Sequence, residues 1–167
     1  MNYLAYGSNL YPPRLEARIS ILSTVGIVEM KNQRLTFGKR GGDGTGKCTL
    51  VDDSSSCAYG VIYEISATDK SNLDRIEGLG DGYEGAWIPY DSIGNCFYYR
   101  APNNQIDNGL QPFDWYKAFV LAGMRHHGFP EGYIAEVQKI TALRDPDSHR
   151  RLKNLELLDD SVLTDLN

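Results

Sequence analysis

The spacing of hydrophobic residues changes once along this chain of 167 residues, and that change limits its fold most strongly. Up to residue 101, apolar residues form short runs rich in Val, Ile, Thr and aromatic side chains, which is typical of β-strands. From Phe113 onward they recur at helical spacing, with Trp115, Phe119 and Ala122 on one face. We find no linker, internal repeat or low-complexity segment, so both halves should share one core. The sequence therefore predicts a single α+β domain over residues 1–167.

The same patterns predict the individual elements. We expect a first strand over residues 1–6, a tight turn at 7–9 and a short helix over 14–19. Further strands are expected over 25–28, 33–37, 48–51, 58–65, 84–90 and 95–101, the early ones as an antiparallel meander. Ser66 can cap a helix that Gly78 ends, which places Glu77 at its C-terminus. Three more helices are expected, from 113 to 128, over 133–140 and over 152–162.

Composition and charge exclude several classes of protein. The net charge is -5 and the Lys and Arg residues are dispersed, so we expect no nucleic-acid partner. The apolar runs are far shorter than the roughly 18 to 20 residues that span a bilayer, and the start of the chain lacks a signal-peptide pattern. Three scattered cysteines form neither a disulfide framework nor a CxxC zinc motif. We expect a cytoplasmic protein with no membrane partner and no metal.

Two motifs suggest chemistry that their context does not support. Residues 41–48 (GGDGTGKC) nearly spell a phosphate-binding P-loop, but Cys48 replaces the Ser or Thr that holds magnesium, and a strand follows where a helix is needed. We interpret this segment as a hairpin loop. His126 and His127 are adjacent, so on a helix they point about 100° apart and cannot chelate a metal together. A position at a helix end, where the helix dipole favours a cation, explains them better.

Two other features are candidates for a functional site. The loop Tyr6-Gly7-Ser8-Asn9-Leu10 follows the first strand, and its successive N–H groups could form a concave site for an anion. Glu77 ends the helix that starts near Ser66, where the dipole disfavours a negative charge. Each feature alone also has an ordinary interpretation, as a strand-to-helix turn and as a solvated surface glutamate.

Taken together, these segments resemble the γ-glutamylcyclotransferase family. The hallmark YGSNL loop of that family is present at residues 6–10, and residues 46–51 (GKCTLV) and 59–65 (YGVIYEI) are similar to two of its strands. Residues 73–78 (LDRIEG) match the Leu-Asp-x-x-Glu-Gly segment that carries the catalytic glutamate, and residues 112–130 are similar to a later helix. The resemblance covers about residues 3–146. Cys48 departs from a usual Ala, and the interval from the glutamate to Tyr83 is one residue shorter than in the family.

The resemblance implies a fold and an activity. The fold would be a small mixed β-barrel with flanking helices and a helical C-terminal third, and a homodimer is one expectation because family members are commonly dimeric. The activity would convert γ-glutamyl amides to 5-oxoproline and a free amine or amino acid, by general acid/base catalysis and without a cofactor. A γ-glutamylamine cyclotransferase acting on γ-glutamyl-ε-lysine, and a non-catalytic binding module of the same fold, stay open as alternatives.

The resemblance also implies the residues of the site. Glu77 would be the catalytic acid and base, and the substrate would be held by Tyr6, Gly7, Ser8, Asn9, Leu10, Tyr83 and Tyr116. The leaving amine or amino acid would be recognised by variable loops at residues 38–46 and 102–111.

Overall fold

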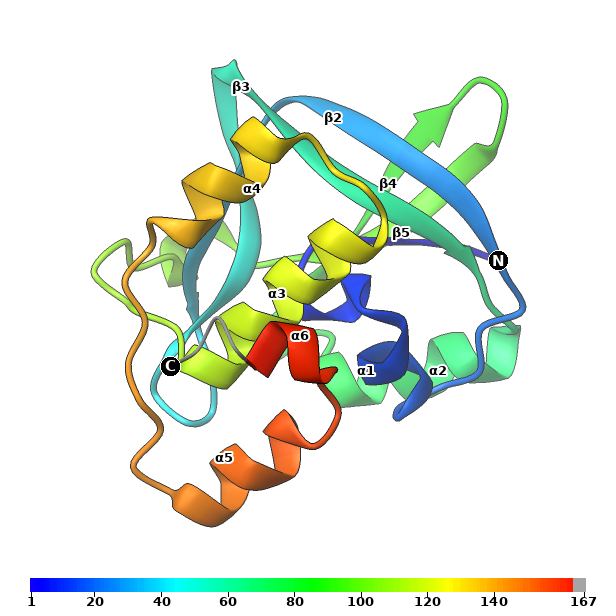
Figure 1. Ribbon diagram of the computed structural model, residues 1–167. Coiled ribbons are helices and arrows are strands. Elements are labelled where there is room, and N and C mark those ends of the chain that lie inside the picture. Colours follow the sequence, from blue (N-terminus) through cyan, green and yellow to red (C-terminus); the bar gives the residue numbers. More distant parts are fainter. Residues whose placement is uncertain (164–167) are drawn as a thin grey trace.

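A five-stranded sheet organises residues 1–163, the part of the chain that the computed structural model describes. Its strands lie in the order β2-β3-β1-β5-β4 (Figure 1). Their bounds are Asn2–Ala5 for β1, Ser23–Arg40 for β2, Gly46–Glu64 for β3, Glu84–Tyr90 for β4 and Gly94–Arg100 for β5. β1 pairs antiparallel with β3 and parallel with β5, so the sheet is mixed. Because β1 is the middle strand, the loop that follows it starts at the centre of the fold.

The two longest strands, β2 and β3, form one bent hairpin where the sequence predicted four short strands. The breaks expected between residues 28 and 33 and between 51 and 58 lie inside these strands. Their pairing shifts register in three places, one of them beside Asn32, whose φ of 59° is left-handed. Such β-bulges bend a strand without ending it, so the polar residues there were wrongly expected to form loops. Residues 41–45 form the turn of this hairpin, which confirms that interpretation of the glycine-rich segment.

The sheet is not closed, and this corrects one part of the predicted fold class. The α+β class, the mixed sheet, the flanking helices and the helical C-terminal third are confirmed, but the expected barrel is an open sheet. Within residues 1–163, the edge strands β2 and β4 do not pair with each other. Closing a barrel requires matched strand tilt and register, and β4 has seven residues against 18 in β2. The expected meander of four short antiparallel strands is one antiparallel hairpin of two long strands, β2 and β3.

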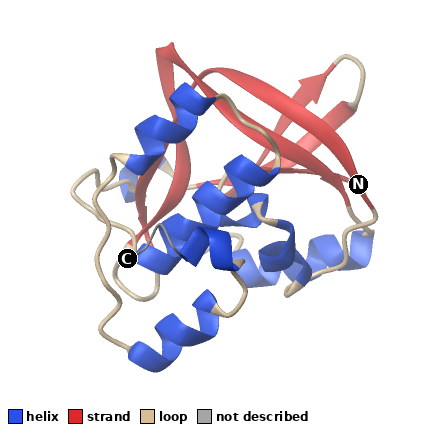
Figure 2. Ribbon diagram, in the orientation of Figure 1, coloured by secondary structure: helices blue, strands red, loops and turns tan. Residues whose placement is uncertain are grey.

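The helices gather mostly on one side of the strands (Figure 2). Their bounds are Ser8–Leu10 (η1), Pro12–Glu16 (α1), Ala67–Glu77 (α2), Asn103–Gln105 (η2), Asp114–His126 (α3), Glu131–Gln138 (α4), Ser148–Leu155 (α5) and Asp160–Leu163 (α6). The single helix expected over residues 152–162 is two helices, α5 and α6. The turn between them buries Leu158, while Leu152 on α5 is 59% exposed. A continuous helix was the wrong prediction because leucine spacing alone does not show which leucines reach the core.

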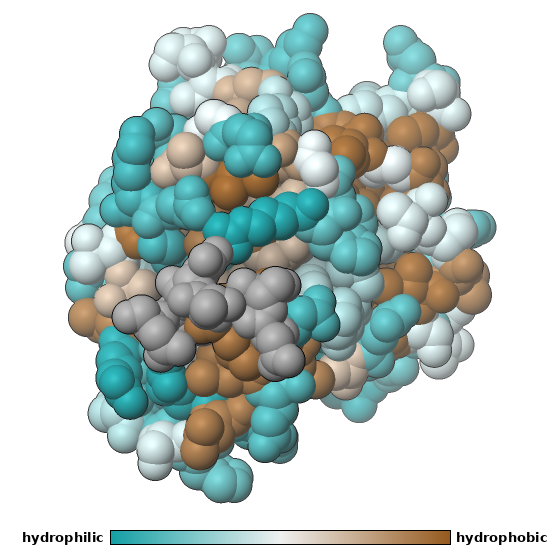
Figure 3. Space-filling model, viewed as in Figure 1, coloured by the Kyte–Doolittle hydropathy of each residue, from teal (hydrophilic) through white to brown (hydrophobic). Residues whose placement is uncertain are grey.

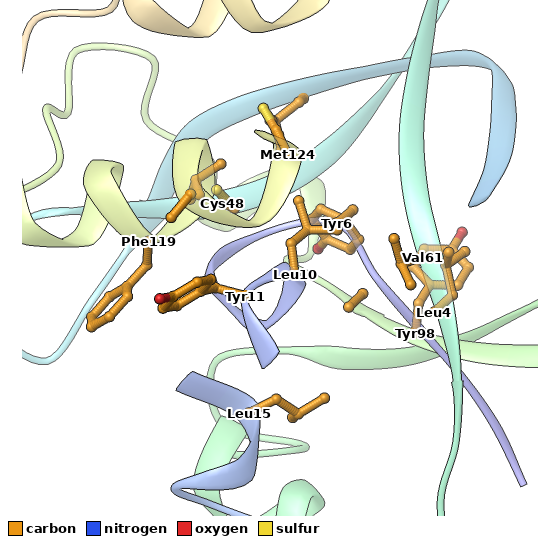
Figure 4. Packing of buried hydrophobic residues seen from close by; sticks show 14 of the residues in the cluster. Leu4, Tyr6, Leu10, Tyr11, Leu15, Cys48, Val61, Tyr98, Phe119 and Met124 are labelled. Atoms are coloured by element: carbon orange, nitrogen blue, oxygen red, sulfur yellow. The ribbon is translucent and has the colours of Figure 1, made fainter. Parts of the chain in front are cut away.

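Helix α3 lies at the centre of the core, against η1 and the start of the chain. Nine of its 13 residues are buried, which explains why its sequence is apolar almost all round. Tyr11 lies beside Phe119 of α3, with ring centroids 6.2 Å apart (Figure 4). Gly123 faces the same segment so closely that a Cβ there would lie 2.4 Å from Leu10 Cβ. The absence of a side chain at Gly123 therefore sets how closely α3 and η1 approach.

The outer surface mixes hydrophilic and hydrophobic residues on the face that Figure 3 shows. Large apolar side chains that remain exposed include Trp87 on β4, Ile76 on α2 and Leu79 after it. Among the helices of residues 1–163, none combines the length and apolar character needed to cross a bilayer.

Candidate active site

A pocket opens where the loop after β1 meets the C-terminal end of α2. It encloses about 330 Å³ of space between atoms, counted out to its open mouth. Seven of the eight residues expected to form the site line it, from four separate parts of the chain. The full lining is Tyr3, Tyr6, Gly7, Ser8, Asn9, Cys48, Glu77, Tyr83, Tyr99 and Tyr116.

Helix α2 places Glu77 at the edge of this pocket. Ser66 caps the helix by accepting a hydrogen bond from the Asp69 N–H, and Leu73 anchors it in the core. Gly78 ends it in a left-handed conformation, with φ 67° and ψ 49°, which glycine adopts without a Cβ clash. Glu77 is therefore the last helical residue, as the sequence predicted, and its side chain is 17% exposed.

An arginine and an asparagine hold the Glu77 carboxylate. Oε1 accepts hydrogen bonds from Arg18 Nη1 at 2.8 Å and from Asn9 Nδ2 at 3.0 Å. Arg18 Nη1 also donates to Asn9 Oδ1 at 3.2 Å, so the three side chains form a closed triangle. Every hydrogen bond from residues 1–163 to this carboxylate goes to Oε1, which leaves Oε2 available to a ligand.

Arg18 is not among the site residues that the sequence predicted. It lies in the turn after α1, where the buried side chains of Leu15 and Ile19 hold the backbone in place. One sequence signal could have pointed to it: a carboxylate at a helix C-terminus faces the negative end of the helix dipole and needs a cation nearby. Charge alone, however, does not say which of the 17 Lys and Arg residues supplies it.

The loop after β1 contributes backbone donors as well as the Asn9 side chain. Ser8 and Asn9 are buried in the pocket wall, and their N–H groups are the first of η1, where the helix itself offers no acceptor. Leu10 is placed differently from the expectation. Its N–H donates to Gly7 O at 3.0 Å and its side chain is fully buried in the core, outside the pocket. Leu10 therefore anchors the loop to the core, and its side chain does not line the pocket.

Tyr83 and Tyr116 hold the backbone of Cys48 between them. The Tyr83 hydroxyl donates to Cys48 O at 2.8 Å, and the Cys48 N–H donates to the Tyr116 hydroxyl oxygen at 3.1 Å. Cys48 in turn lies against Gly7, where an added Cβ would be 2.9 Å from Cys48 Cβ. This contact sets the distance between the loop and β3.

Burial keeps the hydroxyl and thiol groups of the pocket protonated. Burial raises the pKa values of Tyr6, Tyr83 and Tyr116 well above that of a free tyrosine. It also raises the pKa of the Cys48 thiol to about 12. A thiol with this pKa is a poor nucleophile at neutral pH, because the thiolate is the reactive form. The pocket therefore offers neutral hydrogen-bonding groups around one carboxylate.

Further tyrosines, which the sequence analysis did not select, complete the pocket. Tyr3 accepts a hydrogen bond from Asn9 Nδ2 at 2.9 Å, and Tyr6 donates to the carbonyl oxygen of Tyr99. The Tyr99 hydroxyl donates to Asp74 at 2.6 Å. The contact between Tyr6 and Tyr99 joins the end of β1 to β5, and these strands become neighbours only in the folded sheet.

Metal-binding groups do not gather in this part of the structure. In residues 1–163, no three His, Cys, Asp or Glu side chains lie together as a metal site would require. His126 and His127 lie at the end of α3, as expected. His127 Nε2 lies 2.9 Å from Leu10 O, so this histidine supports the back of the loop.

Comparisons with known proteins give the same family resemblance as the sequence motifs. No protein-family model matches the chain. The chain is 23% identical over 151 residues to a γ-glutamylcyclotransferase of Bos taurus and 24% identical over 154 residues to one of Homo sapiens. Each match covers 83% of this chain and 77% of the relative.

Solved structures extend the likeness to the whole fold. One described as "Gamma-glutamyl cyclotransferase" aligns with a TM-score of 0.77 over 99% of this chain and 96% of its own, at 19% identity. YkqA from Bacillus subtilis aligns with a TM-score of 0.72 over 86% of this chain and 56% of its own, at 17% identity. The γ-glutamylcyclotransferase-like fold and the resemblance to that family are confirmed.

Proposed function

We propose that this protein is a γ-glutamylcyclotransferase that acts on γ-glutamyl amides, with Glu77 as its acid and base. The proposal combines the curated relatives named γ-glutamylcyclotransferase with the geometry of the pocket. The observation that supports it most strongly is the Glu77 carboxylate, held by Arg18 and Asn9 beside the unpaired N–H groups of the loop.

The reaction needs no nucleophile from the protein. The α-amine of the γ-glutamyl group attacks its own γ-carbonyl carbon, a new C–N bond closes the five-membered ring of 5-oxoproline, and the amide C–N bond breaks. The enzyme must hold the chain folded so that the amine and carbonyl meet at roughly 3–3.5 Å, which converts binding energy into proximity. A small pocket walled by tyrosine rings suits this task, because it leaves a flexible chain few other conformations.

Glu77 moves the protons. The α-amine arrives as an ammonium, so a base must remove a proton before attack, and the departing nitrogen must then receive one. Glu77 Oε2 can carry two protons one after the other: it removes one from the ammonium before attack and a second from the ring nitrogen after attack, and it delivers both to the departing nitrogen, which leaves as an ammonium. Arg18 and Asn9 hold the carboxylate through Oε1, so these bonds do not occupy Oε2.

The loop and the tyrosines hold the substrate. The N–H groups of Ser8 and Asn9 bind the substrate carboxylate or the oxyanion that forms at the γ-carbonyl, and they are fixed in place before the reaction. Tyr116 accepts a hydrogen bond from Cys48, so its hydroxyl hydrogen can be donated to the substrate. The Tyr83 hydroxyl hydrogen is already given to Cys48 O, so Tyr83 supplies a wall and shapes the backbone.

The test is direct detection of 5-oxoproline by mass spectrometry. The purified protein is incubated with γ-glutamyl dipeptides, γ-glutamyl-ε-lysine and glutathione, beside two variants, Glu77→Gln and Glu136→Gln. Glu136 is an exposed glutamate on α4, so its variant controls for the substitution itself. We expect the wild type and Glu136→Gln to form product and Glu77→Gln to lose at least about 100-fold in rate, the lower range for a general acid or base.

Two results would contradict the proposal. Turnover by Glu77→Gln close to that of the wild type would remove Glu77 from the mechanism. Binding of γ-glutamyl compounds without any product from the folded wild type would favour the binding module instead. Preference for γ-glutamyl-ε-lysine would identify a γ-glutamylamine cyclotransferase.

A further inference from the structure

A groove continues from the pocket at Glu77. Its lining includes Lys39, Arg40, Ile76, Asp81 and Gly82 in addition to Glu77, which also lines the pocket. The groove holds about 990 Å³ of empty space, counted to its open side. A substrate whose γ-glutamyl group fills the pocket must direct its leaving group outward past Glu77. The groove is where that group would lie.

The end of the β2–β3 hairpin and the connector before α3 form one wall of this groove. Asp107 N–H donates to Gly38 O at 2.8 Å, and Gly46 N–H donates to Gln111 O at 2.9 Å. Arg40 pairs with Asp107 at 3.0 Å. These contacts join the two loops in which the sequence analysis placed recognition of the leaving group.

Lys39 is the cation of this wall that lacks a carboxylate partner. Its ammonium lies 4.6 Å from the centre of the Tyr83 ring and packs so closely on Gly82 that a Cβ there would be 2.9 Å from Nζ. Within residues 1–163 it makes no hydrogen bond and no ion pair at bonding distance, whereas Arg40 is already paired. Partial burial lowers the pKa of Lys39 because it desolvates the ammonium, and this effect outweighs the opposing attraction of the carboxylates of Glu77, Asp43 and Asp81.

The position of Lys39 suits one chemical group. In a γ-glutamyl α-amino acid, the carboxylate of the leaving group is two bonds from the nitrogen of the scissile amide. Lys39 reaches the same part of the site, because its ammonium covers the ring of Tyr83, which lines the pocket. Asp81, the other unpaired charge of the groove, is exposed, so water screens its repulsion of an anion.

We propose that Lys39 binds the carboxylate of the leaving amino acid and so selects γ-glutamyl α-amino acids over γ-glutamyl amines. This inference rests on the proposed function. It assigns a specificity role to a residue outside the pocket. It also chooses between γ-glutamyl amino acids and γ-glutamyl amines, which share the γ-glutamyl group that Glu77 and the loop would bind.

The experiment compares two substrates that differ only at that carboxylate, γ-glutamyl-alanine and γ-glutamyl-alaninamide. We expect the wild type to favour γ-glutamyl-alanine by about 10-fold to 100-fold in kcat/KM, the range for one hydrogen bond between charged groups. Lys39→Met should bring this ratio close to one, and Lys39→Arg should keep it well above one. Lys31→Met removes a cation from an exposed position of β2, and its ratio should equal that of the wild type.

The outcomes separate the role of Lys39 from the cyclotransferase activity itself. A wild type that shows no preference, or prefers the amide, overturns the role of Lys39 while the cyclotransferase activity stands. Equal losses on both substrates in Lys39→Met also overturn it, because they indicate packing on Tyr83 instead of charge recognition. Absence of 5-oxoproline from either substrate with the wild type contradicts the proposed function itself.

Discussion

Replacing Gly123 with alanine sets helix propensity against tertiary packing. In the interior of a helix, alanine is more favourable than glycine by about 1 kcal/mol. In α3, however, the new Cβ would lie 2.4 Å from Leu10 Cβ, 2.6 Å from Leu10 C and 2.6 Å from Tyr11 N. Two of these three atoms belong to the backbone of η1 and its C-cap, which cannot turn aside as a flexible side chain could.

The size of the effect follows from that geometry. Ordinary carbon contacts start near 3.5 Å, so α3 and η1 must separate by about 1 Å. Overpacking of this kind costs about 3 kcal/mol at the upper end of the usual range, and the helix propensity of alanine returns about 1. We therefore expect Gly123→Ala to lower the free energy of unfolding by about 2 kcal/mol. For a domain of this size, that lowers Tm by about 4–8 °C.

Gly132→Ala is the matched control. Gly132 is exposed near the start of α4, and an added Cβ there meets no atom within 4 Å. The same substitution should be neutral or stabilising by up to about 1 kcal/mol. Urea unfolding followed by circular dichroism measures both variants. A Gly123→Ala protein as stable as the wild type would show that α3 does not approach η1 this closely, and would refute the reasoning.

Two further predictions concern charged side chains. Arg18→Met should lower stability by about 1–2 kcal/mol in urea unfolding at pH 7, because Glu77 loses a charged hydrogen bond that is mostly shielded from water, and this loss should shrink in a Glu77→Gln background. Asp145 accepts hydrogen bonds from Arg150 and Trp115, which lower its pKa from 3.8 to about 2. Its contribution to stability should therefore be complete above pH 4 and disappear as the pH falls toward 2, and Asp145→Asn should flatten this part of the stability profile.

The sequence predicted the elements well where the cause of an element is local. The helix that ends at Glu77 is an example, because Ser66 at its start and Gly78 at its end determine its length within one segment. The change to helical spacing at Phe113 likewise placed α3 correctly. The bends inside β2 and β3 were not predictable in this way. A polar residue such as Asn32 occurs in a loop or in a bulge, and only the partner strand decides between them.

The candidate site shows the same division. Motifs selected Glu77 and the residues of the loop, and the structure places all of them except Leu10 around one pocket. Arg18 and Tyr99 were missed because their roles come from contacts between residues far apart in the sequence. Leu10 was selected because it stands in the motif, but its N–H is used by Gly7 and its side chain by the core. A sequence motif contains residues that hold a site in shape as well as residues that contact its ligand, and Leu10 belongs to the first kind.

The central position of β1 has a consequence for how this protein is made. Asn2 pairs with Glu64 on one side and with Cys96 on the other, so β1 is synthesised well before both of its partner strands. Contacts so distant in sequence slow folding, because a long loop must close before they stabilise the chain. The pocket lies directly after β1 and also needs Tyr116 from α3. Its assembly therefore comes late, and ligand binding by newly made chains would report completed folding.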